Sequence, residues 1–300
     1  MRAARFAGVV LLSAFALGCR KKNDEPAPAA SSSALSAPVA SGLPIPADAV
    51  ARVVNPSNRP PYAGPTGVIR GLVRSVGDPP PDAPEALAQV PAECDQARAV
   101  YQKLFRVGAN GELADALVAV TGYDAYVPER VPVKVVEARG CAWGTRTLSL
   151  TFGQRIDVLA KDRRPYVPEL VGGRMPAQII AMPGGAASSL YPNNPGRYVL
   201  IDSMRIFATA EVYVLKYPTH GVTNLDGRYE IRGIPPGELT LSALCPQTGE
   251  TVEKKVTLTG GQTLDIDLEL PFNLQKYSEN VANAKAKRPA AALPAPSSSR

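Results

Sequence analysis

The sequence predicts an all-β protein made of two β-sandwich modules, with a disordered N-terminal tether and a disordered C-terminal tail. The 30 prolines and 25 glycines among 300 residues interrupt helices and long strands. Short apolar or alternating segments recur between turn residues, at roughly the 8–12-residue spacing typical of β-sandwiches. The 45% of hydrophobic residues is enough for one large domain or two small ones. The pattern breaks near residue 217, so we expect one module before that point and one after it.

Residues 1–18 predict a signal peptide. Arg2 and Arg5 precede the apolar run from Phe6 to Leu17, which is too short to span a bilayer core of about 30 Å as a helix. The run ends in Ala-Leu-Gly-Cys19, which resembles the lipobox of bacterial lipoproteins. The resemblance implies that Cys19 becomes the mature N-terminus and carries diacylglycerol with palmitate-type chains. The alternative is an ordinary secretory signal that happens to contain a cysteine.

The flanking segments predict little folded structure. Residues 19–65 follow the anchor, and their first part, Pro26 to about Gly42, is mostly Ala, Pro and Ser. Such a composition buries too little apolar surface to offset the entropy of ordering, so we expect a disordered tether. Residues 272–300 end in a similar low-complexity stretch and form the tail, with a short helix as an option at Ser278–Lys287.

The net charge of +6 lies mainly in these flanks. Residues 1–43 sum to +3 and residues 273–300 to +4, which leaves −1 for the folded region between them. No basic stripe with interleaved aromatic residues is present there, so we expect no nucleic-acid partner. The Arg20–Lys22 cluster lies beside the predicted lipid and suits anionic head groups or, equally, a solvated surface. Arg20 in place of Asp favours the outer membrane of the cell envelope.

The first module covers residues 66–216 and is expected to be mostly β-structure. Its candidate strands are apolar or alternating segments: Val68–Val76, Leu113–Thr121, Val131–Glu137, Leu148–Thr151, Ile156–Leu159, Gln178–Ala181, Tyr198–Ile201 and Glu211–Lys216. A helix is expected only around Glu85–Ala88 or Cys94–Leu104.

The second module covers residues 217–271. Turns at Asn224–Gly227, Pro235–Gly237 and Gly260-Gly261 separate its strands. The pattern V-T-x-x-D-G-x-Y-x-I-x-x-I-P-P-G-x-x-x-L resembles the carboxypeptidase regulatory-like (transthyretin-like) β-sandwich and its relatives in rhamnogalacturonan lyases. Such modules are accessory domains, so the resemblance implies a fold and no catalytic group.

The first module resembles the bacterial plastocyanin-like (cupredoxin) proteins. The resemblance rests on Gly67–Val73, Cys94, Asn110–Ala114, Gly140–Trp143 and Leu148–Ile156. A type-1 copper site needs two His, one Cys and usually an axial Met. The positions that correspond to the ligand loops hold Tyr166, Ser203, Arg205 and Ala208, and the single His of the chain, His220, lies outside both loops. We therefore expect a cupredoxin-like sandwich without copper, and no other cofactor.

Three cysteines remain after Cys19. Cys94 and Cys141 match positions of the resembled family, which implies a disulfide between them in an exported protein. Cys245 is then a buried apolar residue or a free thiol. No Cys-x-x-Cys spacing supports a zinc or redox motif.

The sequence gives little support for a catalytic function. His220 is the one imidazole and no G-x-S-x-G motif accompanies it, so we expect a structural His and no catalytic residue. Acid pairs for glycoside chemistry are more simply surface charges; the candidates are Asp157, Asp162, Glu169 and Glu211. The turn-rich segment 183–196 is a candidate binding surface or a flexible connector, and Tyr166 with Tyr191 a candidate aromatic face.

These observations predict a non-catalytic, envelope-anchored lipoprotein that binds or scaffolds a saccharide or a protein. Its membrane contact is the lipid on Cys19. The alternatives are a copper or redox protein with atypical ligands, and a polysaccharide-active accessory protein.

Overall fold

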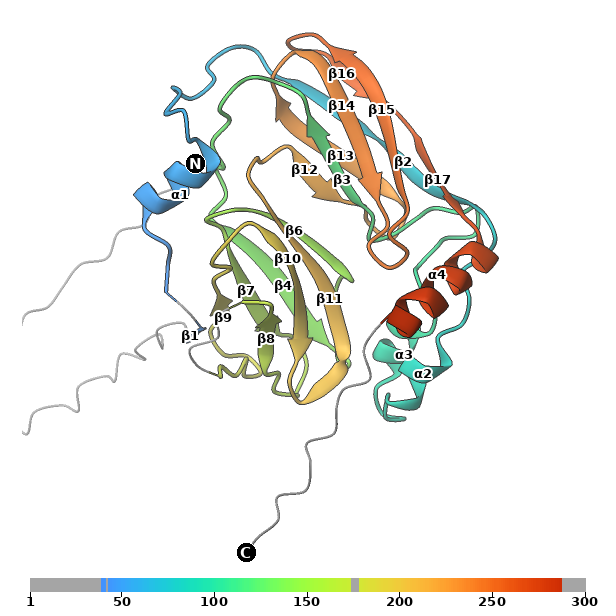
Figure 1. Ribbon diagram of the computed structural model, residues 1–300. Helices are drawn as coiled ribbons and strands as arrows, with labels where there is room; N and C mark the ends of the chain where they lie inside the picture. The colour runs from blue at the N-terminus through green and yellow to red at the C-terminus, as the bar shows by residue number, and fades with distance from the viewer. Residues whose placement is uncertain (1–38, 42, 174–177, 288–300) are drawn as a thin grey trace, which may run out of the picture. The chain divides into compact units, whose positions relative to one another are not determined.

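The computed structural model describes residues 39–41, 43–173 and 178–287 (Figure 1). Most elements in this part of the chain are strands, and they form two β-sandwiches, which confirms the predicted all-β fold class. The predicted signal peptide, Cys19, nearly all of the segment from Pro26 to Gly42 and the end of the tail lie outside the described residues.

Sandwich A consists of β1 and β4 to β11. One sheet has the order β1-β9-β7-β4-β5 and the other the order β6-β11-β10-β8. Their bounds are β1 (Val39–Ser41), β4 (Val133–Arg139), β5 (Ala142–Trp143), β6 (Thr147–Thr151), β7 (Arg155–Ala160), β8 (Pro168–Val171), β9 (Ser188–Leu190), β10 (Gly196–Asp202) and β11 (Arg205–Leu215). Apolar side chains from both sheets form one core, in which Trp143, Leu150, Ile156, Leu200 and Val212 are fully buried.

Sandwich B consists of β2, β3 and β12 to β17. One sheet has the order β12-β3-β14-β15, and in the other β2 pairs with β13, β16 and β17. The bounds are β2 (Gly67–Gly77), β3 (Leu117–Thr121), β12 (His220–Val222), β13 (Arg228–Ile234), β14 (Gly237–Leu244), β15 (Thr251–Leu258), β16 (Thr263–Asp265) and β17 (Leu268–Phe272). Its core includes Ile69, Val118, Ile231, Leu241 and Leu268.

The predicted module boundaries, 66–216 and 217–271, are wrong for two strands. Residues of β2 pair with β13, so that Arg228 lies opposite Leu72, and β3 lies between β12 and β14. Apart from β1, the strands of sandwich A are therefore inserted between β3 and β12. The physical reason is apolar burial: Ile69 and Val73 alternate toward a core most of whose other side chains lie 150 residues or more later in the chain.

Gly71 lets two successive strands share one partner. β16 pairs with the first part of β2 and β17 with its second part, and the chain crosses between them at Ile266 and Asp267. A Cβ at Gly71 would lie 1.9 Å from the Ile266 carbonyl oxygen, so no larger residue fits. The Asp267 carboxylate accepts a hydrogen bond from the Leu72 N–H at the same crossing.

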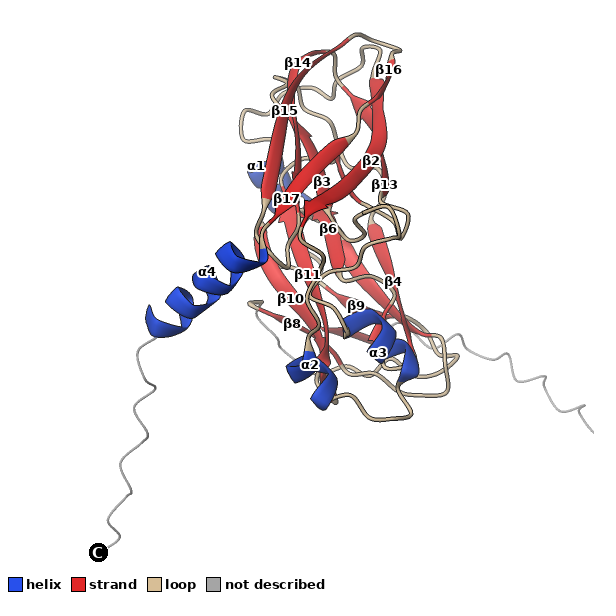
Figure 2. Cartoon of the chain, turned by 90° about the vertical axis from the view of Figure 1, so that its right-hand side faces the viewer, coloured by secondary structure: helices blue, strands red, loops and turns tan. Residues whose placement is uncertain are grey.

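Four helices accompany the described sandwiches (Figure 2). α2 (Pro84–Ala88) and α3 (Asp95–Tyr101) agree with the predicted helical region. α1 (Ala47–Val54) lies within residues 19–65 and α4 (Leu274–Lys287) within residues 272–300, so neither flank is disordered throughout. None of the described helices is both long and apolar enough to cross a membrane.

α1 forms because its apolar side chains have a surface to cover. Val50, Val53 and Val54 follow helical spacing and pack against the core of sandwich A. Gly153 provides the close approach: a Cβ there would lie 2.8 Å from Val50 Cγ1, and the φ of +103° also favours glycine.

One expected strand is absent from the described chain. Residues 178–180 of the candidate strand Gln178–Ala181 are irregular, and only Ala181 makes a single bridge, to Tyr166. Ile179 is nonetheless buried, so the apolar run contributes to the core without a ladder of hydrogen bonds.

Candidate functional site

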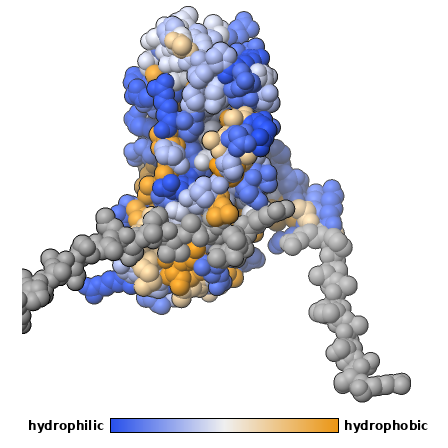
Figure 3. Space-filling model, turned by 90° about the vertical axis from the view of Figure 1, so that its left-hand side faces the viewer, coloured by the Kyte–Doolittle hydropathy of each residue, from blue (hydrophilic) through white to orange (hydrophobic). Residues whose placement is uncertain are grey.

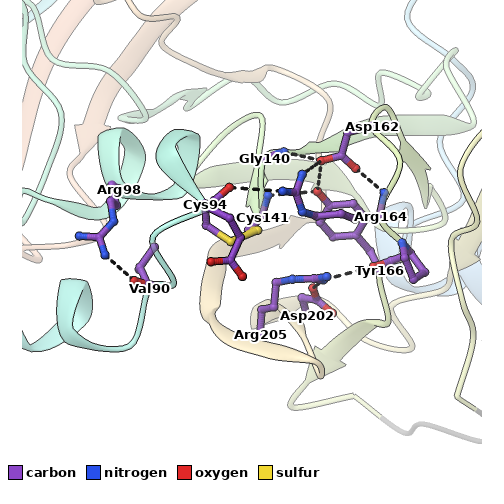
Figure 4. Close-up of a disulfide and its surroundings, with 12 residues drawn as sticks. Val90, Cys94, Arg98, Gly140, Cys141, Asp162, Arg164, Tyr166, Asp202 and Arg205 are labelled. Atoms are coloured by element: carbon purple, nitrogen blue, oxygen red, sulfur yellow. Dashed lines mark hydrogen bonds and ion pairs between the residues drawn. A yellow bond between two sulfur atoms is a disulfide. The ribbon is translucent and has the colours of Figure 1, made fainter.

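Tyr166, Ser203, Arg205 and Ala208 lie at one end of sandwich A. Tyr166 precedes β8, Ser203 lies in the turn between β10 and β11, and Arg205 and Ala208 belong to β11. The antiparallel pairing of β8 with β10 places Pro168 opposite Asp202, and the Ser203 N–H donates to the Val167 carbonyl. Local strand pairing therefore brings Tyr166 to the β10–β11 turn (Figure 4).

Arg205 stacks on Tyr166. Its guanidinium carbon lies 5.2 Å from the centroid of the phenol ring, a cation–π distance. Arg205 also donates to Asp202 Oδ2 at 2.7 Å and to the Pro165 carbonyl at 3.2 Å. Asp202 is fully buried, and its other oxygen accepts the backbone N–H groups of Val167 and Met204. The buried charges are thus paired and hydrogen-bonded.

The Tyr166 hydroxyl completes this network. It donates to Asp162 Oδ2 at 3.0 Å and accepts the Cys141 N–H at 3.1 Å. Burial raises the pKa of Tyr166 to about 12. Burial opposes ionisation of Asp162, but hydrogen bonds from the Gly140 and Arg164 N–H groups and the Tyr166 hydroxyl hold the pKa of Asp162 below its ordinary value.

The predicted disulfide between Cys94 and Cys141 is confirmed. The two Cα atoms are 5.5 Å apart, and the bridge joins the start of α3 to the turn between β4 and β5. Ala97 and Ala208 are buried in the same small cluster. Figure 4 shows the disulfide beside Asp162, Arg164 and Tyr166, so the bridge fixes one wall of the network. The Trp143 indole N–H donates to the Ala208 carbonyl at 2.9 Å.

These residues do not fit a copper ion. Arg205 is a cation, Ala208 has no donor atom, and the Ser203 hydroxyl donates to Glu169 at 2.7 Å. Type-1 copper takes imidazole and thiolate ligands, and the cysteine nearest the network is in a disulfide. Among the residues that the structure describes, no group of three or more His, Cys, Asp or Glu side chains could hold a metal ion.

His220 lies away from this network. It begins β12, and its Nε2 is 3.2 Å from Thr151 Oγ1, which donates to Glu129 at 2.7 Å. Its Nδ1 is buried without a hydrogen-bond partner in the described part of the chain. Burial, with the positive charge of Lys134, lowers the pKa of His220 to about 4. The imidazole is therefore neutral at pH 7, and among the described residues no carboxylate accepts a hydrogen bond from it as in a catalytic triad.

The four candidate acids do not share partners with one another. Asp157 accepts from Arg155 and Ser189, and Glu211 forms two hydrogen bonds with Arg197 at 2.8 Å. Asp162 bonds Tyr166 and Glu169 bonds Ser203, as described above. Each carboxylate is thus held by its own neighbours.

Two further expectations about binding surfaces are wrong. Tyr166 is fully buried and cannot form an exposed aromatic face with Tyr191. Segment 183–196 is not a free connector, because β9 lies in it, between β1 and β7, with its three side chains buried. The polar residues Ser188 and Ser189 gave no sequence signal for a buried strand.

Two features of the surface were not predicted from the sequence. The first is a set of exposed apolar residues, Ile180, Met182, Met204 and Ile206, which we call the apolar rim. The second is a cavity of about 460 Å³ beside α1. The helical spacing of Val50, Val53 and Val54 could have predicted α1, whereas nothing in the sequence marks the cavity.

Comparison with known proteins gives partial likenesses. No family model matches the chain, and no curated protein matches it. Among solved structures, amicyanin from Paracoccus versutus is 12% identical, with 29% of this chain and 84% of that chain covered and a TM-score of 0.25. A copper-containing nitrite reductase from Thermus scotoductus SA-01 is 17% identical over 31% of this chain and 24% of that one, with a TM-score of 0.24.

Proposed function

We propose that this protein is a non-catalytic, lipid-anchored binding module of the bacterial cell envelope, with a protein as its partner. The observation that carries this proposal is the apolar rim around the closed Tyr166–Arg205 network. Its members Ile180, Met182, Met204 and Ile206 are 49%, 55%, 60% and 66% exposed. Figure 3 shows apolar side chains gathered on the lower part of one face of the molecule.

The side chains of the apolar rim are exposed because of the buried contacts next to them. Ala181 exchanges two backbone hydrogen bonds with Tyr166, and Ile180 and Met182 are its sequence neighbours. Met204 and Ile206 flank Arg205, which turns inward over the Tyr166 ring. Because extended neighbours point to opposite sides, the inward position of Ala181 and Arg205 directs Ile180, Met182 and Ile206 outward, and Met204 is exposed in the turn before β11.

The chemistry of the apolar rim favours a protein over a saccharide. Clustered exposed apolar side chains on a soluble domain mark interaction sites, and methionine suits adaptable protein interfaces. A saccharide surface would need an exposed aromatic face, and the Tyr166 ring is buried with its hydroxyl already engaged. The network itself supplies rigidity to the end of the sandwich.

The sequence supports the anchored location. With Cys19 acylated, 19 residues separate the lipid from Val39, the first residue of β1. A tether of that length would be long enough for the folded region to stand off an outer-membrane surface. No metal takes part in the proposed function, and metal analysis of the purified chain should find no stoichiometric copper.

Photo-crosslinking in the cell envelope tests the proposal. A photoreactive residue at Ile206 should give a discrete protein adduct, while the same residue at Leu225, 64% exposed in sandwich B, should not. Combining Met182→Ser and Met204→Ser should abolish the adduct. Identical adducts at both positions, or saccharide binding on a glycan array that the double variant retains, would contradict the proposal.

The anchor has its own test. Cys19→Ser should move the protein from the membrane fraction to the soluble fraction and remove incorporation of labelled palmitate. An unchanged membrane fraction would show that a feature other than the lipid holds the protein there.

A further inference from the structure

We infer that the cavity beside α1 binds a long-chain fatty acid, with Arg130 and Lys216 contacting its carboxylate. The cavity has a volume of about 460 Å³, within the range of small-molecule sites in proteins. It does not involve the apolar rim, so this site and the proposed protein partner are independent.

The body of the cavity is apolar. Val50 and Val54 of α1 form one wall, Val127 and Pro128 another, and Phe152 lies at the end of β6. An alkyl chain gains free energy in such a site in proportion to the apolar surface that it removes from water. α1 is held at the cavity because Val50 packs closely on Gly153.

Two cations lie at the cavity without a carboxylate partner. Within the described part of the chain, neither Arg130 nor Lys216 forms an ion pair. Both side chains are exposed and so can reach a ligand head group at the opening. A carboxylate accepts charge-assisted hydrogen bonds from both residue types.

Glu129 is the one acidic residue that lines the cavity, and it does not prevent the binding of a carboxylate there. Glu129 accepts the N–H groups of Arg130 and Val131 through Oε1 and the Thr151 hydroxyl through Oε2. Its oxygens are therefore engaged by the protein, and the charged residues that line the cavity sum to +1. An apolar cavity with a net positive opening suits an amphiphile with one negative charge at the end of an alkyl chain.

The two cations also distinguish a free fatty acid from the protein's own acyl chains as the ligand. The acyl chains expected on Cys19 end in an uncharged linkage, and they would leave Arg130 and Lys216 without a partner. A free fatty acid supplies the carboxylate that both cations lack. The inference therefore commits to a free fatty acid, and the protein's own lipid is an outcome of the test.

Titration of the full chain with palmitate tests the site, using Cys19→Ser so that no covalent lipid competes. We expect saturable binding of one palmitate per chain, and much weaker binding of hexadecanol, which has the same chain and no charge. Arg130→Gln and Lys216→Gln should each weaken palmitate binding about three- to five-fold, whereas Lys254→Gln on the exposed face of β15 should not change it.

A second experiment fills the cavity with a large side chain and measures palmitate binding. Ala51→Trp on the exposed side of the cavity wall should weaken palmitate binding at least ten-fold, while Ala282→Trp on α4 should leave it unchanged. Thermal unfolding of both variants shows that each is folded. Absence of saturable binding, equal binding of hexadecanol, or an unaffected Ala51→Trp chain would overturn the inference. So would a lipidated wild-type chain that no longer binds palmitate, because the covalent lipid would then be the occupant.

Discussion

Arg106 donates two hydrogen bonds to the carboxylate of Asp115, from Nε at 2.6 Å and from a terminal nitrogen at 2.7 Å. Asp115 is buried and has a left-handed φ of 63°. Its Oδ1 also accepts the Thr145 hydroxyl and the Arg146 N–H, which lie just before β6. One carboxylate therefore ties the chain that leads into β3 of sandwich B to the start of β6 in sandwich A.

Asp115→Asn should destabilise the protein by about 3 kcal/mol, because Arg106 would keep a largely buried charge without its anion. Asparagine tolerates the same left-handed backbone, so the change removes charge without adding strain. Urea denaturation measures the loss. Asp124→Asn removes the exposed partner of Arg59 and should have no measurable effect. Equal effects of the two changes would show that the Asp115 carboxylate is not a structural tie.

The neutral His220 makes stability depend on pH. Its pKa is about 4 in the folded protein against an ordinary value of 6.5, so the unfolded chain binds the proton more readily. The contribution of the neutral imidazole to the free energy of unfolding is therefore fully present above pH 6.5. It is lost as the pH falls from 6.5 to about 4, and the total loss is about 3 kcal/mol.

His220→Gln should flatten the dependence of unfolding free energy on pH between 6.5 and 4.5. The measurement is denaturant unfolding at several pH values, compared with wild type. An equally steep dependence in the variant would show that His220 is not the group that titrates in this range.

The Cys94–Cys141 disulfide should contribute about 4 kcal/mol to stability, since it closes a loop over a sequence separation of 47 residues. Replacing both cysteines by alanine, or reducing the bridge, should lower the unfolding free energy by that order. The double variant should then no longer respond to reductant. A variant as stable as wild type would mean that α3 and the β4–β5 turn hold together without the bridge.

Cys245 should be unreactive in the folded protein. It is a free thiol buried in the core of sandwich B, and burial raises its pKa. A thiol reagent should therefore label it only slowly at pH 8 and completely after unfolding in denaturant. Cys245→Ala should abolish the signal from unfolded, non-reduced protein. Rapid labelling of the native protein would contradict the buried position.

The sequence alone predicted much of the strand content and the disulfide. Alternating segments such as Leu148–Thr151 and Tyr198–Ile201 fall within β6 and β10. These predictions are reliable because side-chain periodicity is a local property of the chain. Where burial depended on a distant partner, as for Ser188 and Ser189 in β9, local composition pointed to a loop instead.

The candidate site was likewise predicted from the sequence only in part. The sequence identified Tyr166, Ser203, Arg205 and Ala208 as positions without copper-type ligands, because residue identity is enough for that conclusion. It could not show that Arg205 covers Tyr166 or that Asp202 is fully buried beneath them. Those contacts depend on the register between β8 and β10, which strand pairing sets.

The sequence by itself determined the fold class, the lipobox resemblance and the ligand types that are missing from the chain. Tertiary structure alone decided which strands share a sandwich, where α1 lies, and which apolar side chains remain exposed. The physical reason is that composition and periodicity act over a few residues, whereas burial is decided by partners far away in sequence. β2 pairs with β13 across some 150 residues, and this pairing buries Ile69 and Val73 in one core with Ile231.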